Sequence, residues 1–454
     1  MNGRCQGFYC GAAVTALLRD PRWNLRRLRP ATLGGDLMPS YNTELAVEVL
    51  IIGGGPAGLT AAAALAPRLK GRVLVVDREK DAGGIPRHSN HPGYGIRDMK
   101  TFISGPAYAH RLVEKALQAG ATIRTQAMVT GWAAPRSVEV TTPQGRLRID
   151  AEAVILATGA RERPRPARLI PGDRPAGVFT TGELQNLVHL QHRTPGRRAV
   201  VVGGELVSWS AVLTLREAAA RTVLMTTRYP TPESYAAFNI PGKLVLRVPV
   251  ATRTRITRII GKKRVEAVEI EHLNSGQRRR VDCDTVVFTG DWIPDHELAR
   301  TASLDLDPGT LGPLIDTMQR ASTPGVFAIG NLVHTADTAD IAALDGRHVL
   351  DPLLRYLHGT EPSERVVRIL VDEPFRWITP GLLRDGDPAP SRRRMLLWTD
   401  KLIRRPHVTV HQDGQQIATH TTAWPASPGR VFRIPANVLN RVDYTGGDVI
   451  IGLQ

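Results

Sequence analysis

The stretch Val49–Asp77, VLIIGGGPAGLTAAAALAPRLKGRVLVVD, decides the fold. It opens with a short, β-branched apolar run, Val49–Ile52, meets three glycines, and continues through an alanine-rich segment to a second apolar run, Val73–Val76. Short β-branched runs favour strands, and alanine favours helix. The stretch therefore predicts a strand, a tight turn, a helix and a second strand.

The glycines of this turn have the spacing that binds a dinucleotide. Gly53, Gly55 and Gly58 follow G-x-G-x-x-G, in which the first allows the turn, the second lets a diphosphate approach the backbone and the third lets helix pack on strand. The helix then presents unpaired N–H groups to the phosphates. Asp77, which ends the second strand, is placed to accept hydrogen bonds from the adenosine ribose. We predict a dinucleotide site here rather than a glycine-rich turn of another kind.

Composition limits the remaining possibilities. A chain of 454 residues is long enough for two or three domains, and no apolar run is long enough to span a bilayer. The net charge of +16 comes from scattered arginines without an aromatic-interleaved basic stripe, so we expect an anionic cofactor, substrate or acidic partner and no nucleic acid. Three cysteines fit a reducing compartment, and we expect the cytoplasm. The absence of C-x-x-C argues against a redox dithiol and a cysteine-ligated cluster, and we predict no metal site.

The domain organisation follows from the order of the apolar runs. Residues 1–44 lack a sustained period and are predicted to be a disordered extension. Residues 45–195 and 284–355 are predicted to form one dinucleotide-binding domain, and residues 196–283 a second one inserted into it. Residues 362–454 alternate apolar and polar positions, which predicts a small β domain. The fold class is α/β, with two Rossmann-like domains and a C-terminal β domain.

The predicted insert repeats the order strand, turn, helix, strand, but its glycines are altered. Gly203 keeps the first glycine, while Glu205 and Ser208 replace the second and third. A carboxylate about 5 Å from a phosphate costs roughly 3 kcal/mol at an effective dielectric near 20, about a hundredfold in binding. The second strand also ends in Thr-Thr-Arg, at 226–228, in place of an acid. The sequence thus disfavours NAD(P) binding at this turn and leaves it open.

Two further turns follow buried strands: Ala157-Thr158-Gly159 and Gly330-Asn331. With them, the span from Val49 to about Leu350 resembles the two-dinucleotide-fold flavin oxidoreductases, which are pyridine nucleotide-disulfide oxidoreductase-like. More narrowly, it is similar to the branch containing the B subunit of hydrogen cyanide synthase, the A subunit of opine oxidase and the α subunits of amino-acid dehydrogenases. The narrower resemblance rests on the stretches GGIPRHSNHPGYGIRDMKTFISGPAYAHRL, VVVGGELVSWSAVLTL, FTGDWIPDHELAR and GVFAIGNLVHTADTAD.

The resemblance implies FAD as the cofactor. In such proteins the last turn carries Gly-Asp, whose carboxylate holds the ribityl chain; here Asn331 takes the Asp position, and an amide can also bond a hydroxyl. The resemblance also implies a small-molecule substrate and, as partner, a second flavoprotein or electron-transfer subunit. The implied cofactor-binding residues are Gly53, Gly55, Pro56, Ala57, Gly58, Asp77, Arg78, Gly84, Ala157, Thr158, Gly159, Gly330 and Asn331.

The long loop after Gly83-Gly84 supplies the candidate catalytic residues. By the same resemblance it runs toward the flavin ring, and it carries Arg87, His88 and His91. A cation there would favour the reduced anionic ring, and a neutral imidazole would accept a proton as hydride leaves the substrate. The alternative is that these three are surface or loop-packing residues. His334 and Asp337, just beyond the Gly330-Asn331 turn (the ribityl turn), are further candidates, and the alternative is that they stabilise this turn.

We therefore predict an FAD-dependent oxidoreductase, one component of a dehydrogenase or oxidase acting on an amine, amino acid or hydroxy acid. Two alternatives stay open. One is an NAD(P)H-dependent flavin reductase, and the other is a non-catalytic nucleotide-binding scaffold.

Overall fold

The computed structural model describes residues 43–69, 72–335 and 337–454. The predicted N-terminal extension, residues 1–44, lies outside these ranges apart from Thr43 and Glu44, which begin the first strand.

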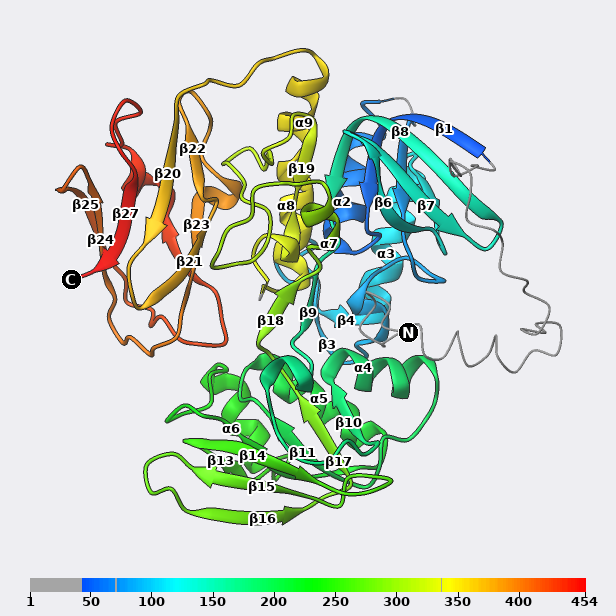
Figure 1. Cartoon of the computed structure of the whole chain (residues 1–454), viewed down its shortest axis with the longest axis vertical. Helices are drawn as coiled ribbons and strands as arrows, with labels where there is room; N and C mark the ends of the chain where they lie inside the picture. The colour runs from blue at the N-terminus through cyan, green and yellow to red at the C-terminus, as the bar shows by residue number, and fades with distance from the viewer. Residues whose placement is uncertain (1–42, 70–71, 336) are drawn as a thin grey trace, which may run out of the picture. The chain divides into compact units, whose positions relative to one another are not determined.

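The first sheet contains the stretch that decides the fold (Figure 1). Strand β1 lies between β2 and β8 and is parallel to both; β8 also pairs with β19, and β7 and β6 extend the sheet in antiparallel fashion. All four residues of β2 are buried, as expected for a strand covered on both faces. The strands are β1 Thr43–Ile52, β2 Val73–Val76, β5 Thr122–Arg124, β6 Met128–Ala134, β7 Ser137–Thr142, β8 Gly145–Leu156 and β19 Val326–Ala328.

The register of this sheet brings the predicted cofactor-binding turns together. Ile52 pairs with both Val76 and Leu156, and Leu156 pairs with Ala328. The four strands are parallel, so the turns that follow them meet at one edge. This carboxyl edge is where open α/β sheets bind ligands.

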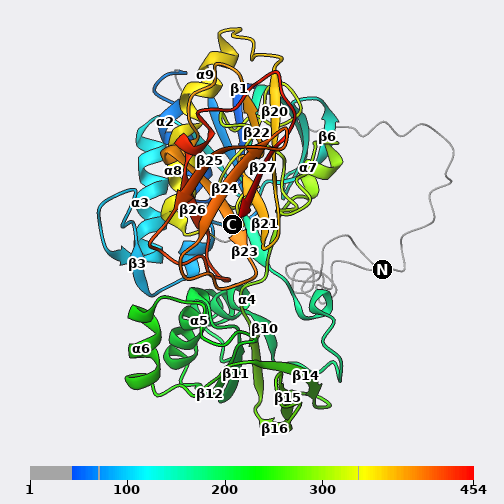
Figure 2. The ribbon, with the colours of Figure 1, turned by 90° about the vertical axis from the view of Figure 1, so that its left-hand side faces the viewer.

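Three helices cover one face of the sheet: α2 Pro56–Leu65, α3 Gly105–Gln118 and α8 Ala339–His348. Figure 2 shows them together on the same side. Helices α2 and α8 pack so closely that a Cβ on Gly346 would stand 2.2 Å from the carbonyl oxygen of Ala57. The small residues of α2 thus allow the helix that follows the last turn to lie directly on the helix that follows the first.

A second parallel sheet has the order β10-β17-β11-β12-β13. Helix α5 Leu206–Glu217 connects β11 to β12, which repeats the arrangement of β1, α2 and β2. Strands β10 and β17 lie just outside the predicted insert of residues 196–283. The strands are β10 Val178–Thr180, β11 Arg198–Val202, β12 Arg221–Thr226, β13 Val250–Ala251 and β17 Thr285–Phe288, with an antiparallel layer of β14 Thr254–Ile260, β15 Ala267–His272 and β16 Arg278–Asp282.

The C-terminal part is all β, as the alternation predicts. Its two sheets have the orders β22-β20-β27-β24-β25 and β21-β23-β26. Asp413 and Gly414 both have positive φ and form the predicted hairpin turn between β24 and β25. The strands are β20 Val366–Val371, β21 Phe375–Thr379, β22 Leu382–Arg384, β23 Arg394–Thr399, β24 His407–Gln412, β25 Gln415–Thr421, β26 Phe432–Pro435 and β27 Val449–Leu453.

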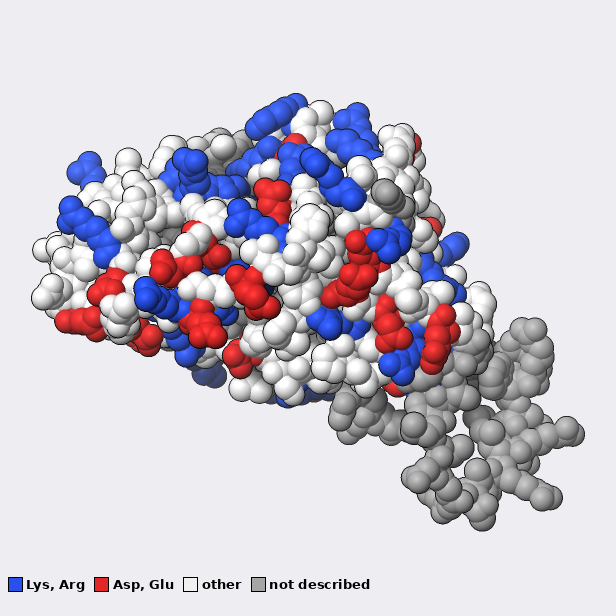
Figure 3. Space-filling view, turned by 90° about the horizontal axis from the view of Figure 1, so that it is seen from above, with Lys and Arg blue, Asp and Glu red and all other residues white. Residues whose placement is uncertain are grey.

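Shorter elements complete the described chain: strands β3 Pro92–Tyr94, β4 Ile103–Ser104, β9 Ala160–Glu162 and β18 Trp292–Pro294, and helices α4 Thr181–Gln185, α6 Ala236–Leu244, α7 Glu297–Thr301 and α9 Leu350–Leu357. Among the helices in these ranges, none combines the length and the apolar character that crossing a membrane requires. The face in Figure 3 carries both basic and acidic side chains, with the basic ones gathered along its upper edge.

Candidate functional site

The first glycine turn is built to leave its backbone open on one side. A Cβ on Gly53 would stand 2.3 Å from the carbonyl oxygen of Ala157, and one on Gly58 would stand 2.0 Å from that of Gly53. Both positions exclude a side chain. A Cβ on Gly55 would meet nothing closer than 4.0 Å. Since Gly55 also precedes α2 without a capping side chain, the N–H groups of the first helical turn remain available to a diphosphate.

Asp77 is buried at the edge of the same turn. Its Oδ2 accepts a hydrogen bond from the N–H of Gly54 at 2.7 Å, and its Oδ1 accepts one from Glu79 at 2.8 Å. Each carboxylate oxygen keeps a second lone pair for a ribose hydroxyl. The neighbouring Arg78 forms an ion pair with Asp295 at 3.3 Å. Gly84 crosses close by, because a Cβ on it would lie 2.9 Å from the Cα of Gly55.

The second and third predicted turns lie against the first. The hydroxyl of Thr158, between Ala157 and Gly159, donates to the carbonyl of Asp295 at 2.8 Å. A Cβ on Gly330 would stand 2.8 Å from the Cβ of Ala57, so the ribityl turn contacts the first turn of α2, next to Pro56. The structure therefore groups all thirteen predicted cofactor-binding positions around one sheet edge.

Asn331 tests whether this site fits a flavin. Its Nδ2 donates to the carbonyl of Asp337 at 3.0 Å, while its Oδ1 is buried and has no hydrogen-bond partner among the described residues. A buried acceptor without a partner costs about 1–3 kcal/mol. A ribityl hydroxyl would satisfy it, so the residues present fit FAD.

Arg87 does not offer a free cation to the site. Its guanidinium lies 3.4 Å from a carboxylate oxygen of Glu79 and 3.6 Å from one of Asp81. The charge of Arg87 is therefore balanced by acids of its own loop, which favours the loop-packing interpretation for this residue.

His88 is buried and His91 is half-buried, and burial lowers the pKa of each imidazole. For His88, burial and then the neighbouring Arg87 charge lower the pKa to about 4, so the ring is neutral at neutral pH. His91 lies 3.0 Å from the Ser89 hydroxyl through Nε2 and 2.9 Å from the Pro92 carbonyl through Nδ1. Nδ1 of His88 has no partner within the described ranges. Of the two imidazoles, His88 thus keeps a ring nitrogen without a hydrogen-bond partner among the described residues.

Side chains from α4 and from the turn of helix that follows it hold this loop in place. His189 lies 2.5 Å from the carbonyl of His88 through Nδ1 and 2.8 Å from Glu217 through Nε2. Gln185 donates to the hydroxyls of Ser89 and Ser210, at 3.3 and 2.8 Å. The contacts of His189 with His88 and of Gln185 with Ser89 join positions 101 and 96 residues apart, so no local pattern of the sequence signals them.

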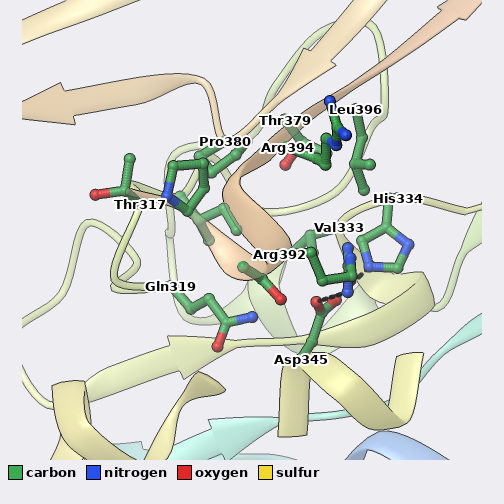
Figure 4. A pocket seen from close by; sticks show the side chains of 13 residues that line it. Thr317, Gln319, Val333, His334, Asp345, Thr379, Pro380, Arg392, Arg394 and Leu396 are labelled. Atoms are coloured by element: carbon green, nitrogen blue, oxygen red, sulfur yellow. Dashed lines mark hydrogen bonds and ion pairs between the residues drawn. The ribbon is translucent and has the colours of Figure 1, made fainter. Parts of the chain in front are cut away.

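His334 belongs to a separate buried cluster (Figure 4). Its Nε2 pairs with Asp345, whose other oxygen accepts from Arg392 at 2.8 Å. Burial alone would raise the pKa of Asp345, but the charges of His334 and Arg392 hold that pKa well below its usual range. Four buried polar atoms in this pocket lack partners in the part of the chain that the structure describes: Thr317 Oγ1, Gln319 Oε1, His334 Nδ1 and Arg392 Nε.

The pocket around this cluster is small. About 20 Å³ is open to the centre of a water molecule, which is enough for one or two ordered waters that would satisfy these polar atoms. Asp337, the other candidate beyond the ribityl turn, pairs with Arg433 of the C-terminal sheet at 2.6 Å. His334 and Asp337 thus connect the ribityl turn to the C-terminal part of the chain.

The comparison with known proteins agrees with this geometry. The chain is 28% identical over 295 residues to thioredoxin reductase of Treponema pallidum (strain Nichols), covering 63% of this chain and 88% of that protein. It is also 28% identical over 339 residues to the A subunit of opine oxidase from Rhizobium meliloti, covering 67% of this chain and 61% of that protein. The matched segment therefore spans less than two thirds of that oxidase component.

Solved structures support the fold alone. Thioredoxin reductase of T. acidophilum matches with a TM-score of 0.57 at 22% identity, covering 70% of this chain and 99% of that one. L-proline dehydrogenase from P. horikoshii matches with a TM-score of 0.51 at 20% identity, covering 71% of this chain and 58% of that one. These matches confirm the predicted α/β class with its dinucleotide-binding folds.

The model of the family described as "Pyridine nucleotide-disulphide oxidoreductase" matches residues 47–346. Members of this family bind FAD, and many use NAD(P) as the reducing partner. The predicted cofactor and the predicted enzyme class are thereby confirmed. Because the match covers more than half of the sequence, the chain belongs to the pyridine nucleotide-disulphide oxidoreductase family and is an FAD-dependent oxidoreductase.

Proposed function

We propose that this chain is the FAD-binding subunit of a dehydrogenase or oxidase that acts on an amine, an amino acid or a hydroxy acid. The observation that carries the proposal is the neutral, buried imidazole of His88 on the loop that crosses the dinucleotide turn, where one ring nitrogen has no partner among the residues that the structure describes. The sequence contains no C-x-x-C, and the described Cys283 is buried with a pKa raised to about 12 by burial. Proton transfer therefore suits this loop better than thiol chemistry.

Three groups of residues would hold the cofactor. The N–H groups at the start of α2 would bind the diphosphate, Asp77 the adenosine ribose, and Asn331 a ribityl hydroxyl. When bound, FAD supplies the acceptor for the two electrons that leave an oxidised C–N or C–O bond.

His88 would act on the substrate as a general base. A neutral imidazole accepts the proton that leaves the substrate nitrogen or oxygen as the double bond to carbon forms. The oxidation removes one hydrogen with two electrons from the substrate carbon, for which FAD would be the acceptor. It also removes one proton from the substrate nitrogen or oxygen, which His88 would accept. His189 and Gln185 would fix the loop that presents His88, through the contacts at the His88 carbonyl and the Ser89 hydroxyl.

The proposal includes a partner protein. The related protein of Rhizobium meliloti is one component of an opine oxidase, and another relative is the reductase component of a benzene 1,2-dioxygenase system. Relatives of this chain thus work in multi-component systems. A second flavoprotein or an electron-transfer protein would take the electrons here, since the sequence shows no cysteine motif for a cluster.

Anaerobic reduction of the purified holoprotein tests this proposal. The flavin absorbance is followed while secondary amines, amino acids and 2-hydroxy acids are added in turn. We expect one of these classes to bleach the flavin, and His88→Gln to slow the bleaching at least tenfold without changing the FAD content. If the flavin of His88→Gln is bleached as fast as that of the wild type, His88 is not the general base. A flavin that no class bleaches, alone or with a co-purified partner, would refute the substrate assignment.

A further inference from the structure

The unit β11-α5-β12, called here the second nucleotide-binding unit, carries an acid in the turn between β11 and α5. Glu205 directly precedes α5, and its Oε2 accepts a hydrogen bond from the N–H of Gly204 at 3.0 Å. The hydroxyl of Ser208 lies 2.7 Å from that of Thr289, and Ser208 is fully buried. The carboxylate thus lies at the start of α5, at the position where Gly55 leaves the first turn open to a diphosphate.

A second carboxylate lies against the same turn. Glu205 and Glu233 are only 6% and 8% exposed. A Cβ on Gly204 would stand 2.4 Å from Oε2 of Glu233. One oxygen of each carboxylate has no hydrogen-bond partner among the described residues. Burial raises the pKa of Glu233 to about 8, and the Glu205 carboxylate adds to that rise, so Glu233 is protonated at neutral pH.

A loop from the C-terminal sheets lies over these two acids. The loop joins β25 to β26, and its residues Ala426 and Ser427 are buried. A Cβ on Gly429 would stand 2.8 Å from the Cβ of Glu233 and 3.0 Å from that of Glu205. The guanidinium of Arg430 lies 4.7 Å from the centre of the Tyr235 ring. The loop is therefore seated on the turn through both backbone and side-chain contacts.

The basic residue that follows β12 remains exposed. An arginine at this position of a dinucleotide-binding unit can hold the 2′-phosphate of NADP. Here Arg228 donates to the Tyr229 hydroxyl at 2.9 Å and lies 5.0 Å from the centre of that ring. The obstruction of this unit therefore lies at the diphosphate position.

We propose that the loop Ala426–Arg430 and the Glu205–Glu233 pair close the second nucleotide-binding turn, so that this chain takes no electrons from NAD(P)H. The nucleotide that many family members use does not fit the residues present. A phosphate about 5 Å from the Glu205 carboxylate would bind about a hundredfold more weakly at an effective dielectric near 20, and the loop would have to leave. The inference goes beyond the proposed function, because it holds for any substrate that reduces the flavin.

The first test is nicotinamide binding by the full-length holoprotein. NADH and NADPH are titrated separately while the nicotinamide fluorescence is followed, and each is then mixed anaerobically with the flavoprotein. We expect no saturation up to about 1 mM and no bleaching, while dithionite bleaches the flavin in the same sample. Saturable binding of either nucleotide, or bleaching by either, would overturn the proposal.

The second test asks whether the loop is seated on the acids. Gly429 and Gly414 have nearly equal φ, +80° and +76°, but a Cβ on Gly414 would meet nothing within 4 Å. Gly429→Glu and Gly414→Glu therefore carry the same backbone strain, and Gly429→Glu alone adds a carboxylate beside two others. We expect tryptic cleavage after Arg430 to be at least tenfold faster in Gly429→Glu than in Gly414→Glu.

Equal cleavage rates in the two variants would contradict the seating of the loop. If Gly429→Glu fails to fold, Gly429→Ala replaces it with Gly414→Ala as its control, because the Cβ alone meets the two glutamate side chains. Fragment masses assign the cut to the bond after Arg430.

Discussion

Asn331 places an amide where related flavoproteins carry an acid, and the amide leaves one buried acceptor oxygen unpaired among the described residues. We expect Asn331→Ala to weaken FAD binding by roughly three- to tenfold, the value of one ordinary hydrogen bond. The measurement is the quenching of flavin fluorescence as FAD is added to apoprotein, with Asn437→Ala as a control away from the turn. An unchanged dissociation constant would show that Oδ1 does not contact the cofactor.

Two glycines of the first turn, Gly55 and Gly58, allow FAD binding and helix packing to be tested separately. Gly55→Glu has room for its Cβ but brings a carboxylate to the diphosphate, so we expect about a hundredfold loss of FAD affinity and an unchanged thermal midpoint of the apoprotein. Gly58→Ala forces a contact of 2.0 Å with a carbonyl oxygen and should cost the apoprotein about 1–3 kcal/mol. Thermal unfolding and FAD titration of both variants provide the comparison.

Glu233 gives the protein a specific dependence of stability on pH. Its folded pKa of about 8 lies above the ordinary value of 4.5, so the folded state holds a proton that the unfolded state loses between these values. Stability must therefore fall as pH rises through this window, by up to about 1.4 kcal/mol per pH unit. We expect the free energy of unfolding in urea to be the same for Glu233→Gln and the wild type at pH 5, and to be larger for Glu233→Gln at pH 8. Glu361→Gln, on an exposed segment, should show no such gain.

At the scale of elements, α8 is fixed to the C-terminal part through Asp345. Asp345→Asn leaves the buried His334 and the half-buried Arg392 without their acid, and we expect the free energy of unfolding at pH 7 to fall by about 3–5 kcal/mol. The pKa of Asp345 is depressed, so this contribution is present above pH 3.8 and decreases as pH falls below it. Denaturant midpoints at pH 7 and pH 3 measure the change. Asp385→Asn, which breaks an exposed pair with Arg365, should cost less than about 1 kcal/mol.

The elements differ in how far the sequence predicts them. The unit β1-α2-β2, the helix beginning at Ala339 and the hairpin at Asp413-Gly414 are confirmed, because each depends on local spacing, glycines and turn residues. The contact of His189 with the loop that carries His88 and the seating of the loop at Gly429 depend on residues far apart in the chain. No local pattern encodes such contacts. The boundaries of the four predicted domains and the role of each site residue stay predictions.

At the scale of the whole molecule, the C-terminal sheets and the flavin-binding part share buried ion pairs. Arg433 pairs with Asp337 beside the ribityl turn, and Arg384 pairs with the fully buried Asp316 at 3.0 Å. We therefore expect one cooperative thermal transition, and we expect added FAD to raise its midpoint as a whole. Differential scanning calorimetry with and without FAD measures both. Two separate transitions, of which FAD shifts one, would show that the C-terminal part unfolds independently.

The closed turn also bears on protein engineering. The two acids and the seated loop obstruct the second nucleotide site together, and removing one of them leaves the others in place. We therefore expect no active variant from a library of single substitutions screened for growth on a nicotinamide-dependent reaction. Directed evolution toward such activity would have to begin from combined changes at Glu205, Glu233 and Gly429.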